Sequence, residues 1–388
     1  EKMSVVKFAD VCQKIGSGAT PRGGKEAYCA EGVTLVRSQN VLDFSFSNDG
    51  LAYINDEQAD KLRNVELQSG DVLLNITGDS VARACLMDDD YLPGRVNQHV
   101  SIIRADESKV VNSYLLYYLQ WRKSHLLQLA SAGATRNALT KGMIEQLEID
   151  LPSLGEQRKV VGILDSIQNK IKLNHEINDN LAVLLQTVYQ ERFGDVDKAV
   201  EQGVLSDICS YSKDRVAVSE LDVSTYFSTE NMLPRKAGST EATSLPTTPQ
   251  TTACHKGDTL ISNIRPYFKK IVYCEDECGC STDVLCFMPN QPQYSAYLFS
   301  TLYADKFFAF MVAGAKGTKM PRGDKQRIMT YPIVLPSEVA LAEFNIIALP
   351  LIKQIYSNRA ENKRLSLLRD TLLPKLMSGE LDVSDIDL

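Results

Sequence analysis

The chain has 388 residues, 44% of them hydrophobic, and this length predicts two domains with packed cores. Its formal net charge of −7 excludes a globally basic nucleic-acid binder, so nucleic-acid binding would require basic residues gathered on one face. No apolar run approaches the roughly 18 residues of a membrane span, and nine scattered cysteines favour a reducing cytoplasm over a disulfide framework. We therefore expect a cytoplasmic protein that does not bind membranes.

The first predicted feature is a glycine-rich loop, GSGATPRGGK, from Gly16 to Lys25. A nucleotide-binding Walker A loop requires Gly, four residues, Gly, Lys and then Ser or Thr. Here Ala19 stands in place of the first glycine, Glu26 replaces the hydroxyl, and Pro21 lacks a backbone N–H. A nucleotide cradle is therefore disfavoured. Two alternatives remain: a surface turn, or a loop that offers basic side chains to another polymer of phosphates.

Short β-rich runs separated by turns follow, namely GVTLVRS, GDVLLNIT and HVSIIRA. An aromatic-rich helix is predicted near Tyr114 to Leu127, followed by a glycine-marked loop and a strand that ends at LPS. A helix of roughly 38 residues begins next, because Ser153 and Glu156 form a Ser-x-x-Glu capping box, and Gly194 can end it. A helix of this length needs a partner that buries its apolar stripe.

The same order of segments occurs twice. GDVLLNITG begins at Gly70 and GDTLISNIR at Gly257, while SYLLYYL and AYLFSTL carry Tyr114 and Tyr297. The LPS strand end also recurs, and the matches stay in order at a nearly constant separation. The chain therefore contains a duplicated unit of about 184 residues, which is much longer than a solenoid repeat.

The second copy also ends in a long helix, with a weaker start. Ser337 can cap it, but Ala340 stands where the glutamate of a capping box would be. Pro350 is expected to kink or delay the helix, so that part of it starts near Leu351.

Both helices carry an apolar seam at coiled-coil spacing, and each position of one seam has its counterpart at the repeat distance in the other. Two asparagines interrupt each seam, where a buried amide penalises wrong registers. The alternative is that these asparagines lie on the flank and face water. We favour an intramolecular antiparallel pairing over a parallel homodimer. The predicted seam consists of Ile167, Ile171, Asn174, Asn178, Leu181, Leu184 and Val188 in the first helix, and Leu351, Ile355, Asn358, Asn362, Leu365, Leu368 and Leu372 in the second.

These elements predict an α+β fold in which two similar globular domains are joined by two long antiparallel coiled-coil helices with pseudo-twofold symmetry. The expected boundaries are residues 1–152 and 196–336 for the globular domains, 153–195 for the first helix, and 337–388 for the second helix with a C-terminal tail. One chain would thus imitate a twofold-symmetric DNA binder, which reads two half-sites at a separation set by the protein. Because the copies have diverged, the half-sites would differ, and the site would be asymmetric with a fixed gap.

Several motifs in this order resemble the DNA-specificity subunit (S subunit) of type I restriction–modification systems. They are the GATPRGG opening, GDVLLNITG, NQHV, LPSLGEQRKVVGILDSIQNKI and the terminal LLPKLMSGELDV, and the resemblance covers essentially the whole chain. It implies that the globular domains are target-recognition domains and that the long helices are spacers that also hold partner subunits. The second copy departs from the pattern, because it lacks a GxTP opening and a counterpart of Gln157 and Arg158.

The resemblance also implies a non-catalytic chain that recognises a bipartite, asymmetric site in double-stranded DNA. Such a chain places two modification subunits, which are DNA adenine methyltransferases, and recruits restriction subunits that act as translocase and endonuclease. S-adenosylmethionine, ATP and magnesium are expected on those partner subunits, and no cofactor is expected in this chain.

Base reading requires amide and guanidinium side chains, while lysine, serine and threonine suit phosphates. For any one candidate, the alternative is a solvated loop charge. In the first domain the expected DNA-binding residues are Arg22, Lys25, Arg37, Gln39, Asn40, Asn75, Thr77, Arg95, Asn97, Gln98, Thr135, Arg136, Asn137 and Lys141. In the second domain they are Arg235, Lys236, Asn263, Arg265, Tyr267, Lys269, Lys270, Lys316, Lys319, Arg322 and Lys325.

Other chemistry is sparse. Cys274, Cys278, Cys280 and Cys286 suggest zinc, but their spacing differs from that of a ribbon or finger, so we favour buried or semi-exposed thiols and expect no metal. The four histidines are far apart in the sequence, and no catalytic triad or carboxylate pair can be argued from spacing. No catalytic residue is predicted.

Two other functions stay open at the level of sequence. A scaffold protein could use the coiled coil to tether two protein- or glycan-binding domains, and an NTPase could use the glycine-rich loop. DNA binding that depends on the gap between half-sites would distinguish a specificity subunit from a scaffold protein. Nucleotide hydrolysis by the chain alone would indicate an NTPase.

Overall fold

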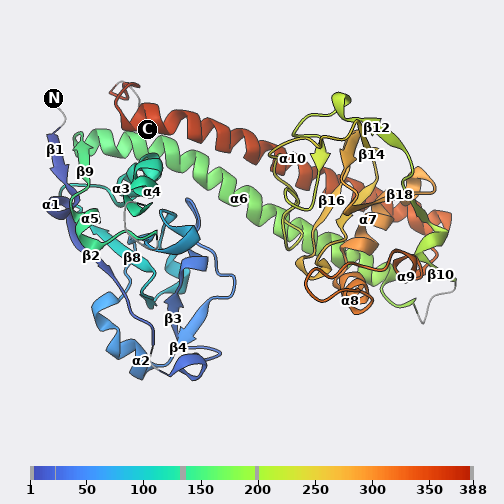
Figure 1. Cartoon of the computed structure of the whole chain (residues 1–388), viewed down its shortest axis with the longest axis horizontal. Helices are drawn as coiled ribbons and strands as arrows, with labels where there is room; N and C mark the ends of the chain where they lie inside the picture. The colour runs from blue at the N-terminus through green and yellow to red at the C-terminus, as the bar shows by residue number, and fades with distance from the viewer. Residues whose placement is uncertain (1–3, 22, 132–136, 197–200, 385–388) are drawn as a thin grey trace. The chain divides into compact units, whose positions relative to one another are not determined.

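The computed structural model describes residues 4–21, 23–131, 137–196 and 201–384. The chain forms two compact units: Glu1–Lys172 with Asn362–Leu388 make up the first, and Leu173–Glu361 makes up the second. Each unit combines small β-sheets, short helices and a segment of each long helix (Figure 1). This is the α+β composition that the sequence predicts.

The first unit contains small sheets with strand orders β2-β8-β5-β6, β4-β3-β7 and β1-β9. Neighbouring strands are antiparallel except for β3 and β7, which are parallel. The strands are β1 (Ser4–Lys7), β2 (Cys12–Ser17), β3 (Val33–Val36), β4 (Ala52–Ile54), β5 (Val72–Asn75), β6 (Ala84–Leu86), β7 (Gly94–Val96), β8 (Val100–Ala105) and β9 (Glu148–Leu151). The helices are α1 (Phe8–Val11), α2 (Asp56–Lys61), α3 (Asn112–Trp121), α4 (Lys123–Ser131), α5 (Lys141–Glu145) and the long α6 (Leu154–Phe193).

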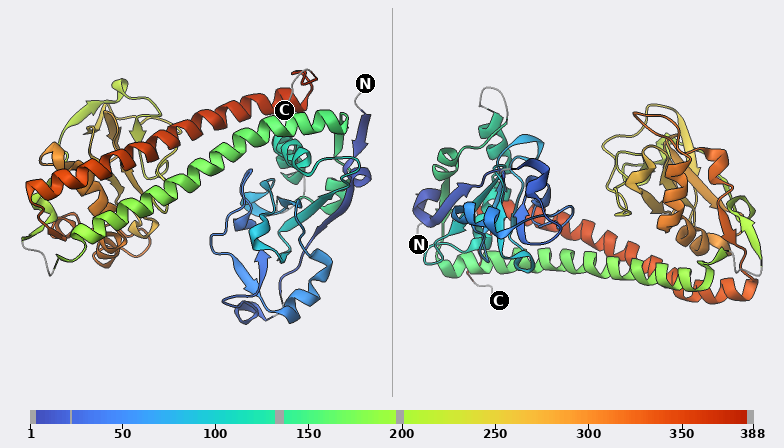
Figure 2. Two further views of the ribbon diagram at one scale, coloured as in Figure 1. Left: turned by 180° about the vertical axis from the view of Figure 1, so that it is seen from behind. Right: turned by 90° about the horizontal axis from the view of Figure 1, so that it is seen from below.

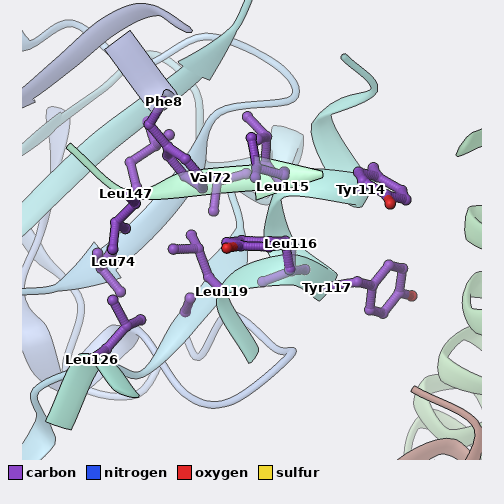
Figure 3. Close-up of a cluster of buried hydrophobic side chains, with 14 of the residues drawn as sticks. Phe8, Val72, Leu74, Tyr114, Leu115, Leu116, Tyr117, Leu119, Leu126 and Leu147 are labelled. Atoms are coloured by element: carbon purple, nitrogen blue, oxygen red, sulfur yellow. The ribbon is translucent and has the colours of Figure 1, made fainter. Parts of the chain in front are cut away.

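The main core of the first unit lies where α3 contacts β5, β6 and β8. Phe8, Leu74, Leu119, Leu126 and Leu147 belong to one buried cluster, and their side chains converge in Figure 3. Burial of each large side chain stabilises the fold by roughly 1.5–3 kcal/mol relative to exposure. This core fixes the strands whose ends carry the polar loops described below.

The second unit repeats the strand order of the first. The order β11-β18-β15-β16 matches β2-β8-β5-β6, and the pair β10-β19 matches β1-β9, so the predicted duplication is confirmed; a further sheet has the order β12-β14-β17-β13. The strands are β10 (Gln202–Val204), β11 (Cys209–Tyr211), β12 (Arg215–Ala217), β13 (Tyr226–Phe227), β14 (Gln250–Cys254), β15 (Thr259–Ser262), β16 (Ile271–Tyr273), β17 (Cys278–Cys280), β18 (Val284–Pro289) and β19 (Pro332–Val334). The helices are α7 (Ser295–Tyr303), α8 (Asp305–Ala313), α9 (Lys325–Ile328) and the long α10 (Glu338–Met377).

The aromatic-rich helix predicted near Tyr114 to Leu127 is two helices in the structure, and so is its counterpart in the second copy. In the first unit α3 ends at Trp121 and α4 begins at Lys123, and in the second α7 and α8 are separated by Ala304. Ala304 has an extended backbone with φ −64° and ψ 142°, which an α-helix does not accommodate. The apolar pattern continues across both breaks, and this continuity explains the prediction of a single helix.

Helix α6 begins as its sequence predicts. The Glu156 N–H donates to Ser153 Oγ at 3.3 Å, and the Ser153 N–H donates to Glu156 Oε2 at 2.9 Å. These two bonds form the reciprocal capping box, and the helix then continues for 40 residues.

The sequence predicted that part of helix α10 starts near Leu351, and this prediction is wrong. The helix runs without interruption from Glu338 to Met377 and includes Pro350. The Ala340 N–H donates to Ser337 Oγ at 3.3 Å, so the serine caps the helix without the glutamate of a capping box. Pro350 lies on an exposed face, where water can bond the carbonyl that the proline leaves unpaired.

In each unit a segment of α6 lies beside an antiparallel segment of α10 (Figures 1 and 2). In the second unit Asn358 Nδ2 donates to Asn178 Oδ1 at 2.9 Å. In the first unit Asn362 Nδ2 donates to the Ile171 carbonyl at 3.2 Å. All four seam asparagines are buried, so the alternative that they face water on the flank is wrong.

Two predicted seam residues lie outside the seam. Leu184 and Leu368 are each 47% exposed, whereas Leu185 and Tyr189 are buried in α6 and Leu373 is buried in α10. The buried positions here follow four-residue steps, close to the 3.6-residue period of a straight helix, and so drift from the 3.5-residue repeat of a coiled coil. Of the other predicted apolar positions, Ile167, Ile171 and Ile355 are buried, and Leu181, Val188, Leu351, Leu365 and Leu372 are partly buried.

Among the described residues, α10 alone is long and apolar enough to cross a membrane. An 18-residue stretch of it has a mean hydropathy of 1.4, and 28% of that stretch is buried. Charged residues interrupt the stretch, so it is not an unbroken apolar run. Core helices of water-soluble proteins can have the same length and composition.

Candidate nucleic-acid interface

In the first unit the opening loop joins two other loops through backbone contacts. The Gly18 N–H donates to the Asn97 carbonyl at 3.1 Å, and the Asn97 N–H donates to the Val36 carbonyl at 3.0 Å. A Cβ at position 18 would lie 1.7 Å from the Val96 carbonyl oxygen, so only glycine permits this approach. Gly18 therefore serves the packing of one loop against another.

A second set of contacts joins the end of β5 to the late loop. The Ile76 N–H donates to the His99 carbonyl at 3.0 Å, and the Gly78 N–H donates to the Asn137 carbonyl at 3.2 Å. Thr77 Oγ1 lies 2.6 Å from His99 Nδ1. The segments that carry the predicted residues thus lie next to one another. We call residues 17–18, 36–40, 75–78, 95–99 and 137–141 the first loop surface.

Three residues expected to bind DNA instead hold these loops together. Asn40 and Asn75 are fully buried, and their amides donate to main-chain carbonyls at 2.9 and 2.8 Å. Arg95 is 6% exposed, and its Nε donates to the Ala59 carbonyl at 3.1 Å. All three side chains thus bond the main chain in the structure, and their contact with DNA stays a prediction.

The other first-unit candidates are placed in several ways. Arg37 and Gln39 both donate to the Gly50 carbonyl, and Gln98 Nε2 lies 2.9 Å from His99 Nε2. Asn97 is 8% exposed, and its Oδ1 accepts from the His99 N–H at 3.0 Å. Asn137 and Lys141 are exposed, and Lys141 Nζ lies 3.4 Å from Glu145 Oε1. Arg22, Thr135, Arg136 and the side chain of Lys25 lie outside the described residues.

In the second unit three loops meet in the corresponding place. The Arg265 N–H donates to the Pro321 carbonyl at 2.8 Å, and the Arg235 N–H donates to the Phe268 carbonyl at 2.7 Å. The predicted basic residues of these loops are therefore neighbours in space. We call residues 234–236, 263–270 and 316–323 the second loop surface.

Two lysines of this surface are fixed by one carboxylate. Lys236 Nζ and Lys269 Nζ each lie 2.8 Å from Asp305 Oδ1, and their hydrogen bonds lower the pKa of Asp305 to about 2. Lys236 also lies 4.6 Å from the ring centroid of Tyr303, and burial lowers the pKa of its amine. Asp305 therefore holds both lysines, and their contact with DNA stays a prediction.

An aromatic pair projects from the same surface. Tyr267 is 50% exposed and Phe268 39% exposed, and their ring centroids are 4.8 Å apart. The sequence prediction included Tyr267 and missed Phe268, because it considered polar and charged side chains first. The available signal was an aromatic pair between cations in RPYFKK, since exposed rings next to cations suit stacking on bases.

The remaining second-unit candidates vary in exposure. Arg322 and Lys316 pair with Asp283 and Asp324 at 2.9 and 2.5 Å. Lys270 Nζ donates to the Thr229 carbonyl. Arg235, Lys319 and Lys325 are exposed, and Asn263 is 6% exposed.

A surface hollow of about 330 Å³ adjoins the second loop surface. Asp283, which pairs with Arg322, lines it together with Glu230 and Glu241. These carboxylates would repel a phosphate, whereas a carboxylate can accept a hydrogen bond from the amino group of cytosine.

The cysteines of the second unit lie in its smaller core. Cys254, Cys274, Cys278, Cys280 and Cys286 are all buried there, and the sulfur atoms of Cys274 and Cys278 are 3.5 Å apart. Hydrogen bonding to Cys278 raises the pKa of the Cys274 thiol. Within the part of the chain that the structure describes, no group of His, Cys, Asp or Glu side chains is arranged to hold a metal ion. The five cysteine side chains pack in this smaller core.

Two copies of one α+β domain, each with polar loops gathered on a surface, define a class of paired recognition domains. The family model described as "Type I restriction modification DNA specificity domain" matches residues 1–182. These residues are similar to that family, and the resemblance drawn from the sequence motifs is confirmed.

Relatives extend the similarity beyond these residues. The type I restriction enzyme MjaIX specificity subunit of Methanocaldococcus jannaschii is 25% identical over 340 residues, which cover 71% of each chain. The putative type I restriction enzyme MjaX specificity subunit of the same organism is 23% identical over 190 residues, 47% of this chain and 43% of that protein. The chain thus matches less than half of the length of the MjaX subunit.

A solved structure shares the fold. The S subunit of a type I restriction–modification system from M. genitalium superposes with a TM-score of 0.57 at 14% identity, and the match covers 96% of both chains. At this identity the similarity concerns the fold alone.

Proposed function

We propose that the chain is a non-catalytic specificity subunit that recognises a bipartite, asymmetric site in double-stranded DNA. The observation that carries this proposal is the pair of loop surfaces, built on one strand order but bearing different side chains. One backbone used twice with different polar groups suits two different half-sites. The recognition parts are residues 1–152 and 196–336, and the spacer parts are residues 153–195 and 337–388.

The partners in this proposal are two adenine-methylating modification subunits, with restriction subunits joining them. Supporting this, two exposed apolar pairs occupy equivalent places in the two copies: Val183 with Leu184 on α6, and Leu367 with Leu368 on α10. Their exposed fractions are 67%, 47%, 70% and 47%. Repeated apolar positions on a helix surface suit two copies of one partner. S-adenosylmethionine, ATP and magnesium would then be bound by the partners, and the assembly would act in the cytoplasm.

The test is competition binding with duplexes that carry the bipartite motif. The motif is first obtained by sequencing methylated adenines in the host genome, and the gap between its halves is then varied by one base pair. We expect loss of specific binding by the complex of the chain with its modification subunits, because a protein-set separation cannot follow a changed gap. Binding that ignores the gap would contradict the proposal and favour a tethering protein.

A further inference from the structure

The two loop surfaces share one turn that has the same backbone geometry in both copies. In the first unit Gly78 and Ala82 have φ values of 76° and 67°. When GDVLLNITG is aligned with GDTLISNIR, their counterparts in the second unit are Arg265 and Lys269, which have φ values of 51° and 52°. All four residues therefore adopt the left-handed backbone conformation, which costs free energy for every residue type except glycine.

The hydrogen bonds around this turn also correspond. The Gly78 N–H donates to the Asn137 carbonyl at 3.2 Å, and the Arg265 N–H donates to the Pro321 carbonyl at 2.8 Å. Pro321 follows Asn137 at the distance that separates the duplicated units, so the two acceptors are also counterparts. The turn thus accepts glycine, the least strained residue there, in one copy and carries arginine in the other. Strain of this kind at an equivalent position points to a use for the side chain.

The side chain of Arg265 is left for a ligand. Its Nε is buried without a hydrogen-bond partner, and its guanidinium forms no ion pair with any described residue. Lys269, the other strained cation, is instead held by Asp305 at 2.8 Å. Tyr267 is 50% exposed two residues beyond Arg265, so the turn also presents an aromatic surface.

We propose that Arg265 reads a guanine in the half-site of the second unit, an inference that rests on the proposed function. Burial of Nε restricts the orientation of the Arg265 guanidinium, and the guanidinium fork matches the O6 and N7 acceptors of guanine in the major groove. A phosphate contact needs no such orientation, since a mobile exposed lysine supplies it. The left-handed backbone then maintains the direction of the side chain.

The test uses the full chain in complex with its modification subunits and a duplex library with randomised half-sites. Arg265→Gly removes the fork and relieves the strained backbone, as Gly78 does in the first copy. We expect a thermal midpoint equal to or above that of the wild type. We also expect one guanine position of the second half-site to lose about tenfold or more of its discrimination, with the first half-site unchanged. Arg265→Lys should regain affinity without regaining this discrimination.

Lys269→Gly is the matched control, because it relieves the same backbone strain and removes a cation that is tied to Asp305. Because a lysine suits a phosphate and not a particular base, this substitution should keep the guanine preference of the second half-site and alter affinity alone. The inference is overturned if Arg265→Gly keeps the guanine preference, if Arg265→Lys restores it, or if Arg265→Gly lowers the thermal midpoint. A wild-type complex that selects no motif from the library contradicts the proposed function itself, which separates the two failures.

Discussion

At the scale of single residues, His255 joins three segments of the second unit. Its Nδ1 lies 2.6 Å from Glu277 Oε2, and its Nε2 lies 3.1 Å from Asp214 Oδ2. The hydrogen bonds to Glu277 and then Asp214 raise the pKa of His255 above its usual value of 6.5. The protonated imidazole therefore stabilises the folded state at low pH.

The pH dependence of this contribution can be predicted. Because the folded pKa is raised, the stabilisation is fully present below about 6.5 and is lost as the pH rises through the folded pKa. His255→Gln should lower the thermal midpoint by about 1–3 °C at pH 6 and by less at pH 9, since the pair is partly exposed. Thermal scans at both pH values check this. His175→Gln, on the exposed surface of α6, is the control, and an equal loss at both pH values would contradict the prediction.

Side-chain direction is what the sequence could not supply for the candidate interface. Asn40, Asn75 and Arg95 lie on segments that meet at the first loop surface, yet all three side chains turn inward to bond the backbone. A side chain that points into the core and one that points to solvent can have the same residue type and the same place in the sequence. Only the packed structure, which decides the partner of each buried carbonyl, separates them.

At the scale of elements, the asparagine pair of α6 and α10 is the clearest determinant of helix pairing. Asn178 and Asn358 are 7% and 6% exposed and bond each other at 2.9 Å. Asn358 also accepts from Gln354 Nε2 at 2.7 Å. A shifted register would place one amide against an apolar side chain without a hydrogen bond.

Asn358→Ala should therefore destabilise the protein by about 1–3 kcal/mol, because Asn178 Oδ1 loses its donor in a buried site. The double substitution Asn178→Leu with Asn358→Leu should recover most or all of this loss, since no amide is then left unpaired. Urea unfolding gives the free energies, and size-exclusion chromatography with light scattering reports any new oligomer. A double variant less stable than the single one would show that the pair contributes more than mutual satisfaction.

The long helices were largely predictable because their signals are local. The capping box at Ser153 and the repeated apolar period belong to the sequence itself. The continuity of α10 through Pro350 was not predictable, since it depends on whether the freed carbonyl faces water. Likewise, the departure of Leu184 from the seam depends on how far the pair follows a supercoil.

At the scale of the whole molecule, the two exposed apolar pairs bear on stoichiometry. If each pair docks one modification subunit, Leu367→Ser with Leu368→Ser should reduce the complex from two modification subunits to one. Val183→Ser with Leu184→Ser should have the same effect, and the four substitutions together should leave none. Native mass spectrometry of the purified complex counts the subunits.

The control for this prediction is Val312→Ser on α8, which replaces another apolar side chain that is 40% exposed. It should keep the full complex. Retention of two modification subunits by the four-fold variant would place the docking surface elsewhere.

The matching turns at Gly78 and Arg265 make the molecule its own reference in any binding measurement. Both copies belong to one polypeptide, so they are always present in equal amounts, at the same ionic strength and with the same history of handling. A substitution in one copy can be scored as the ratio of preferences between the two half-sites. Errors in active concentration cancel in that ratio. The ratio therefore reveals small changes in recognition that a measurement of absolute affinity would miss.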